Sequence, residues 1–103
     1  MIDLEPRYIE LVRRILARYV PKLEVRVFGS RINGTSRAYS DLDLVIVGMD
    51  ALDWQRLNSL KEAFAESDLP FMVDVLDWNQ ISDEFRKLID RNYEVIQKAG
   101  DNV

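Results

Sequence analysis

The chain has 103 residues, a length that suits one domain with a single core and is too short for two. Apolar residues make up 48% of it and the net charge is −4, which is typical of a folded protein. The negative charge argues against tight, sequence-independent binding to a long nucleic acid, because such binding depends on Lys and Arg. On the basis of the chain length and composition, we interpret residues 1–103 as one domain.

Two residue types that carry much of protein chemistry are absent. The chain has no cysteine, which excludes disulfides and cysteine-ligated zinc sites. It also has no histidine, which excludes the Ser-His-Asp arrangement, most transition-metal sites and the commonest general base. Acid–base chemistry in this protein must therefore depend on carboxylates.

No apolar stretch approaches the roughly 20 residues that span a bilayer. The first five residues, Met1 to Glu5, are acidic and lack the positive region of a signal peptide. We expect a cytoplasmic protein that does not bind a membrane.

The first half of the chain predicts one helix and two strands. Apolar residues recur at helical spacing up to Pro21, and Pro6 suits the first turn of that helix. Alternating residues at 23–27 predict a short strand that ends before Gly29, residues 30–40 a helical turn and a loop, and residues 43–48 a second strand.

The second half of the chain predicts two further helices and one strand. Helices are predicted at 53–67 and at 82–98, capped by Asp53 and Ser82, with a strand at 71–76 between them. The expected fold class is α+β (α/β), with a small three-stranded mixed β-sheet flanked by about four helices.

The most informative pattern joins a small-residue turn to two acids. Gly29-Ser30 is followed, after ten residues, by Asp41-Leu42-Asp43 at the start of a β-branched run. Because side chains alternate along a strand, Asp41 and Asp43 are expected on the same face. Carboxylates suit Mg²⁺, which usually arrives with nucleotide phosphates, and Gly29-Ser30 could bind those phosphates.

A third acid, Asp74, lies within the predicted strand at 71–76, between Val73 and Val75. A carboxylate in a buried strand is costly unless it is paired or metal-bound. If Asp74 shares the face of Asp41 and Asp43, the three can hold one or two divalent ions against a triphosphate. The third acid could also deprotonate or orient an acceptor hydroxyl, so this pattern favours nucleotidyl transfer with loss of pyrophosphate.

These residues resemble a known family. Gly29-Ser30, the ten-residue interval and Asp41-x-Asp43 are similar to the signature of nucleotidyltransferases of the DNA polymerase β superfamily, including its Phe-Gly-Ser-Arg and Ser-Asp-Leu-Asp-Leu edges. The chain most resembles the minimal, single-domain MNT-type proteins that are encoded beside HEPN-domain partners. The resemblance covers essentially the whole chain.

The resemblance implies a role for each matching residue. Gly29 and Ser30 would bind the triphosphate with Arg31 as a further phosphate contact, Asp41 and Asp43 would ligate Mg²⁺, and Asp74 would be the third catalytic and metal-binding carboxylate. It also implies ATP as donor and transfer of AMP to a tyrosine of a HEPN toxin, with this chain as the antitoxin. A homo- or hetero-oligomer is compatible with such a partner.

Structural alternatives remain open at several positions. Asp41 could cap the entry to a strand, and Asp74 could form a salt bridge to Arg26. Asp77 is a rival for the third acid, although its position three residues from Asp74 would point it to the opposite face. Tyr39, just before the acidic pair, could cover a nucleotide base.

Two other functions also remain open. The chain could be a non-catalytic antitoxin that blocks its partner by binding, using its negative charge against a basic RNA-binding cleft. It could instead modify a small molecule, although it lacks the helical acceptor domain of larger relatives.

Overall fold

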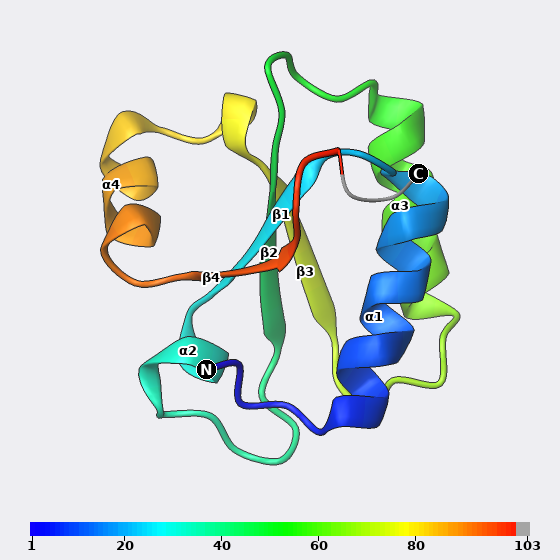
Figure 1. The fold of residues 1–103 in the computed structure, drawn as a ribbon, viewed down its shortest axis with the longest axis vertical. Helices are drawn as coiled ribbons and strands as arrows, with labels where there is room; N and C mark the ends of the chain where they lie inside the picture. Colours follow the sequence, from blue (N-terminus) through cyan, green and yellow to red (C-terminus); the bar gives the residue numbers. More distant parts are fainter. Residues whose placement is uncertain (101–103) are drawn as a thin grey trace.

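The computed structural model describes residues 1–100 and consists of a four-stranded sheet with helices on both sides (Figure 1). In chain order its elements are α1 (Pro6–Tyr19), β1 (Glu24–Phe28), α2 (Ser30–Asn33), β2 (Leu42–Val47), α3 (Trp54–Ala65), β3 (Val73–Asp77), the 3₁₀ turn η1 (Trp78–Gln80), α4 (Asp83–Arg91) and β4 (Glu94–Gln97). No helix formed by residues 1–100 is long and apolar enough to cross a membrane.

The strands lie in the order β3-β2-β1-β4. The central strand β1 is antiparallel to both of its neighbours, whereas β2 and β3 are parallel and are joined through α3. Strands β3 and β4 are therefore the two edges of the sheet, and β2 lies inside it.

The hydrophobic core fills the space between the sheet and the pair α1 and α3, which lie together on one side in Figure 1. Alternate residues of β1 and β2 face this core, as the period of two requires. The most completely buried side chains that the sheet and the two helices contribute to this core are Val12, Leu16, Val25, Val27, Leu42, Leu44, Ile46, Leu60 and Val75.

The opposite face of the sheet is more polar and is covered in part by α4 (Figure 1). Phe28 of β1 meets Phe85 of α4 edge to face, with ring centroids 5.8 Å apart. Arg26 lies over the rings of Trp78 and Tyr93, at 5.0 and 4.3 Å from their centroids. This face also carries Asp43, because that residue pairs with Phe28 across β1 and β2.

Two predicted helix caps, Asp53 and Ser82, are confirmed, whereas α1 begins after Glu5 without a side-chain cap. The Asp53 carboxylate accepts a hydrogen bond from the Gln55 N–H at 3.1 Å, and the Ser82 hydroxyl accepts one from the Phe85 N–H at 3.1 Å. These bonds satisfy backbone donors that the first turn of a helix leaves free.

The predicted three-stranded sheet is wrong, because the last helix ends at Arg91 and residues 94–97 form β4. Asn92 adopts an extended conformation that ends the helix. Beyond it, Ile96 enters the core, and the Gln97 amide donates to the carbonyls of Val20 and Leu23, both at 2.8 Å. Pairing with β1 therefore outweighs the helical spacing of the apolar residues at 85–96.

Candidate functional site

The turn between β1 and α2 depends on Gly29. Its φ of 80° and ψ of −150° are unfavourable for a residue with a side chain. A Cβ at this position would lie 3.3 Å from Asp43 Cγ and overlap Asp43 Oδ2. Glycine thus lets the backbone before Ser30 come directly against the Asp43 carboxylate.

Three carboxylates lie along neighbouring strands at this end of the sheet. Asp43 on β2 is paired in register with Phe28 on β1 and with Asp74 on β3. Asp41 immediately precedes β2 and is exposed. The predicted convergence of Asp43 and Asp74 on one face agrees with this register, since directly paired residues point to the same side.

The electrostatics of the site centre on Asp43, which is half-buried. Burial raises the pKa of its carboxyl group, and the negative charges of Asp74 and then Asp41 raise it further. None of the three acids forms a salt bridge within residues 1–100. Their mutual repulsion is therefore left without a cationic side chain to offset it.

Asp74 differs from its predicted setting. It is exposed because β3 is an edge strand. Asp43, on the interior strand β2, is instead the acid whose charged side chain is partly buried. The alternative of an Asp74 salt bridge to Arg26 is wrong, since Arg26 pairs with Glu24 and, at 3.0 Å, with Asp90. Asp74 remains free to act on a ligand.

Asp77 is a structural residue, as its position along the strand predicted. Its carboxylate is only 4% exposed and accepts hydrogen bonds from the Leu52 N–H at 2.7 Å and the Asn79 N–H at 3.0 Å. It thus fixes the chain after β3 and the start of α3, and it does not join the three acids.

The donor chemistry of the three acids fits a hard divalent cation, because Mg²⁺ prefers carboxylate oxygens and keeps several waters. The raised pKa of Asp43 adds a second reason, since a nearby cation would offset both the burial of this carboxylate and the repulsion from Asp74 and Asp41 that raise the pKa. As the side chains stand, no group of three Asp, Glu, His or Cys residues in the described range 1–100 is arranged to hold a metal ion. The carboxylates would have to turn toward one another to share one.

Arg31 is buried, with 6% of its surface exposed. Its two terminal nitrogens donate to the carbonyls of Asp3 at 3.1 Å, Ala38 at 3.4 Å and Ser40 at 2.8 Å, and its guanidinium lies 4.9 Å from the Phe71 ring centroid. These contacts tie the N-terminal segment to the loop that leads into Asp41. The sequence did not reveal this packing, because an arginine after Gly-Ser suggests a phosphate contact.

Comparisons with known proteins identify the family of this chain. Residues 10–101 match the family described as polymerase beta, nucleotidyltransferase. The chain belongs to this family. It is 45% identical over 102 residues to the probable protein adenylyltransferase MntA of Haemophilus influenzae, covering 99% of this chain and 90% of that protein.

Two solved structures share the fold of this nucleotidyltransferase. A chain in the crystal structure of a mutant toxin-antitoxin MntA-HpeT matches with a TM-score of 0.73 and 23% identity, over 91% of this chain and 77% of the other. A chain in the complex of a tri-AMPylated Shewanella oneidensis HEPN toxin with MNT antitoxin matches with a TM-score of 0.61 and 22% identity, over 93% and 74%.

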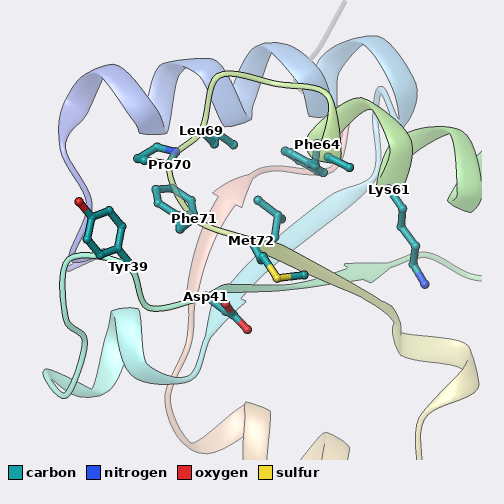
Figure 2. Close-up of a pocket in the computed structure, with 10 residues that line it drawn as sticks. Tyr39, Asp41, Lys61, Phe64, Leu69, Pro70, Phe71 and Met72 are labelled. Atoms are coloured by element: carbon teal, nitrogen blue, oxygen red, sulfur yellow. The ribbon is translucent and has the colours of Figure 1, made fainter.

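The nucleotidyltransferase also has a cavity of about 580 Å³ beside Asp41, which the sequence did not predict (Figure 2). It lies where the loop before β2, the C-terminal half of α3 and the chain entering β3 meet. Aromatic and aliphatic side chains form most of its wall, and the lining residues include Tyr39, Asp41, Lys61, Phe64, Phe71 and Met72. The only signal in the sequence was the position of Tyr39, two residues before Asp41.

Proposed function

We propose that this chain is a Mg²⁺-dependent protein adenylyltransferase, which transfers AMP from ATP to a HEPN-domain toxin and so acts as its antitoxin. The observation that carries the proposal is the placement of Asp43 between the Gly29 turn and Asp74, within a chain of the nucleotidyltransferase family. The name of the Haemophilus influenzae relative supports AMP transfer to a protein. We expect the reaction to occur in the cytoplasm, where ATP is available.

Each residue has a defined part in this proposal. The backbone at Gly29 and the hydroxyl of the adjacent Ser30 would donate hydrogen bonds to the triphosphate. Gly29 lies against the Asp43 carboxylate, so a Mg²⁺ ion held by Asp43 would be close to the phosphates. Asp41, Asp43 and Asp74 would hold one or two Mg²⁺ ions. When bound, Mg²⁺ would neutralise phosphate charge and stabilise the charge that develops on the leaving pyrophosphate.

The transfer itself is an in-line displacement at the α-phosphorus of ATP. The acceptor hydroxyl oxygen forms a bond to that phosphorus, the bond to the bridging oxygen of the β-phosphate breaks, and pyrophosphate leaves with the electron pair. The exposed carboxylate of Asp74 accepts the hydroxyl proton, which is the only base chemistry that a chain without histidine needs.

Arg31 contributes by positioning Asp41 in this scheme. Three backbone carbonyls already accept hydrogen bonds from its terminal nitrogens, which leaves little of the guanidinium for a phosphate. Because Ser40 is one of the three acceptors and directly precedes Asp41, the side chain of Arg31 fixes the backbone from which that carboxylate projects.

The test is transfer of labelled AMP to the purified HEPN partner in the presence of Mg²⁺. The wild type should label the partner, and the double variant Asp41→Ala/Asp43→Ala should not. Asp50→Ala is the matched control, since Asp50 is also exposed but lies at the opposite end of β2. If the double variant still labels the partner, the proposal is overturned. If the double variant does not label the partner but still fully neutralises the toxin in cells, the chain is better described as an antitoxin that acts by binding.

A further inference from the structure

The cavity beside Asp41 lies on the β3 side of the candidate site. The Gly29 turn follows β1, Asp43 is on β2 and Asp74 is on β3, so the functional residues follow one another across three neighbouring strands. Strands are about 5 Å apart, so Asp74 lies roughly 10 Å from the β1 side. The cavity borders the N-terminal end of β3, on the side of the acids that is remote from the turn.

This arrangement separates the two ends of an in-line displacement. The entering oxygen and the leaving oxygen must lie on opposite sides of the reacting phosphorus. If the triphosphate binds at Gly29 and Ser30, the pyrophosphate leaves toward β1. The acceptor hydroxyl must then approach from the side of Asp74 and the cavity.

The rim of the cavity has the composition of a protein-binding surface. Tyr39 and Met72 are 76% and 75% exposed and both line this one cavity, whereas other exposed apolar residues such as Met49 and Trp54 do not line it. Figure 2 shows Met72 between Asp41 and Lys61, whose side chain extends from the C-terminal half of α3. Lys61 forms no salt bridge with any residue in the described part of the chain.

We propose that this cavity binds the acceptor segment of the protein substrate. The segment carries its reactive hydroxyl toward Asp74, places an apolar or aromatic side chain against Tyr39 and Met72, and pairs an acidic side chain with Lys61. The inference rests on the proposed function and specifies which surface selects the acceptor. An acceptor segment bound in this way would cover the exposed side chains of Tyr39 and Met72, which the transfer of AMP from ATP does not itself require.

The competing occupant is the nucleoside of ATP, since an aromatic-lined cavity of this size would also accept a base. The two occupants differ in one measurable respect. A nucleoside site controls the affinity for ATP, whereas an acceptor site controls the KM for the partner and leaves the affinity for ATP unchanged.

The experiment compares Lys61→Glu and Met72→Glu with matched controls elsewhere on the surface. Lys87→Glu reverses an exposed lysine on α4, and Met49→Glu changes a methionine that is 97% exposed after β2. For each variant, ATP affinity is measured by calorimetry and AMP transfer over a range of partner concentrations. Thermal melting first establishes that all four variants are folded.

We expect Lys61→Glu and Met72→Glu each to raise the KM for the partner by about tenfold or more, as loss of an interface anchor does. Their ATP affinity and the behaviour of both controls should match the wild type. An unchanged KM for the partner overturns the inference, and so does a loss of ATP affinity, which would assign the cavity to the nucleoside. Absence of transfer by the wild type would instead show that the proposed function itself has failed, and this inference with it.

Discussion

Gly29 and Asp43 are in direct contact across the β1–β2 pair, so that the Asp43 carboxylate occupies the space where any other residue at position 29 would place its Cβ. The spacing of Gly-Ser and Asp-x-Asp in the sequence therefore corresponds to a physical contact. Since Asp43 also lies beside Asp74 on β3, this contact joins the proposed phosphate-binding turn to the acids.

The contact predicts that Gly29→Ala abolishes AMP transfer. The added methyl group displaces the Asp43 carboxylate, and the positive φ strains the backbone by about 1 kcal/mol. Gly34→Ala is the matched control, because Gly34 has a φ of 77° and nothing within 4 Å of its Cβ position. Urea unfolding should show a small backbone cost for Gly34→Ala, whose backbone is in the left-handed region, and a larger cost for Gly29→Ala, whose ψ of −150° suits only glycine. Only Gly29→Ala should lose transfer, and equal activities of the two folded variants would contradict the role of the contact.

The raised pKa of Asp43 predicts how stability depends on pH. A carboxyl group whose pKa is higher in the folded state binds protons more tightly there, so the stability of the wild type falls as pH rises from the ordinary aspartate pKa of about 4 through the raised value. Asp43→Asn removes this loss, and the variant should be the more stable protein at neutral pH without metal.

Urea unfolding of the wild type and Asp43→Asn between acidic and neutral pH measures this effect. The difference in free energy of unfolding should narrow as the pH falls, because the wild-type carboxyl becomes protonated. A wild type that is the more stable of the two at neutral pH without metal would show that repulsion among the acids is unimportant.

Mg²⁺ should make the wild type more stable than Asp43→Asn, which is the reverse of the order expected without metal. An ion that binds only the folded state stabilises it by about 1.4 kcal/mol at a concentration ten times its Kd. The melting temperature of the wild type should therefore rise with Mg²⁺ and fall back with EDTA, while Asp41→Asn and Asp43→Asn should respond weakly. Asp50→Asn, which changes an exposed acid remote from the site, should respond like the wild type. An identical Mg²⁺ response in all four proteins would argue against a metal site at these acids.

Arg31→Ala should lower the free energy of unfolding by about 2–4 kcal/mol, because it leaves the carbonyls of Asp3, Ala38 and Ser40 without their donor. Arg37→Ala, an exposed arginine in the same loop, should change stability by less than about 0.5 kcal/mol. Chemical unfolding checks both values, and Arg31→Lys should recover only part of the loss, since lysine cannot donate in the same planar fork. Equal stabilities for Arg31→Ala and Arg37→Ala would contradict the positioning role.

The sequence predicted most of the fold where local signals and packing agree. The caps at Asp53 and Ser82 and the alternation along β1 and β2 each appear in the structure. It failed at the C-terminal strand, because the apolar spacing from Phe85 to Ile96 suits a helix as well. Only the free edge of β1, which no local pattern encodes, decides in favour of β4.

In the candidate site, too, the sequence predicted some features and missed those that depend on how distant segments pack together. Strand periodicity predicted that Asp77 would not share the face of Asp74, and Asp77 is indeed a structural residue. The shared face of Asp43 and Asp74 was only a condition in the sequence analysis, because it depends on the register between β2 and β3. The exposure of Asp74 could not be predicted, since it depends on β3 being an edge strand. The cavity at Lys61 and Met72 could not be predicted either, because segments distant in the sequence form it together.

The single-turnover rate of AMP transfer to the HEPN partner by Asp74→Asn tests most directly whether the acids of β2 and β3 act together in one reaction. In that reaction Asp74 accepts the proton of the acceptor hydroxyl. We expect transfer by the wild type and a rate at least about 100-fold lower for Asp74→Asn. Transfer by Asp74→Asn at the wild-type rate would contradict this role of Asp74.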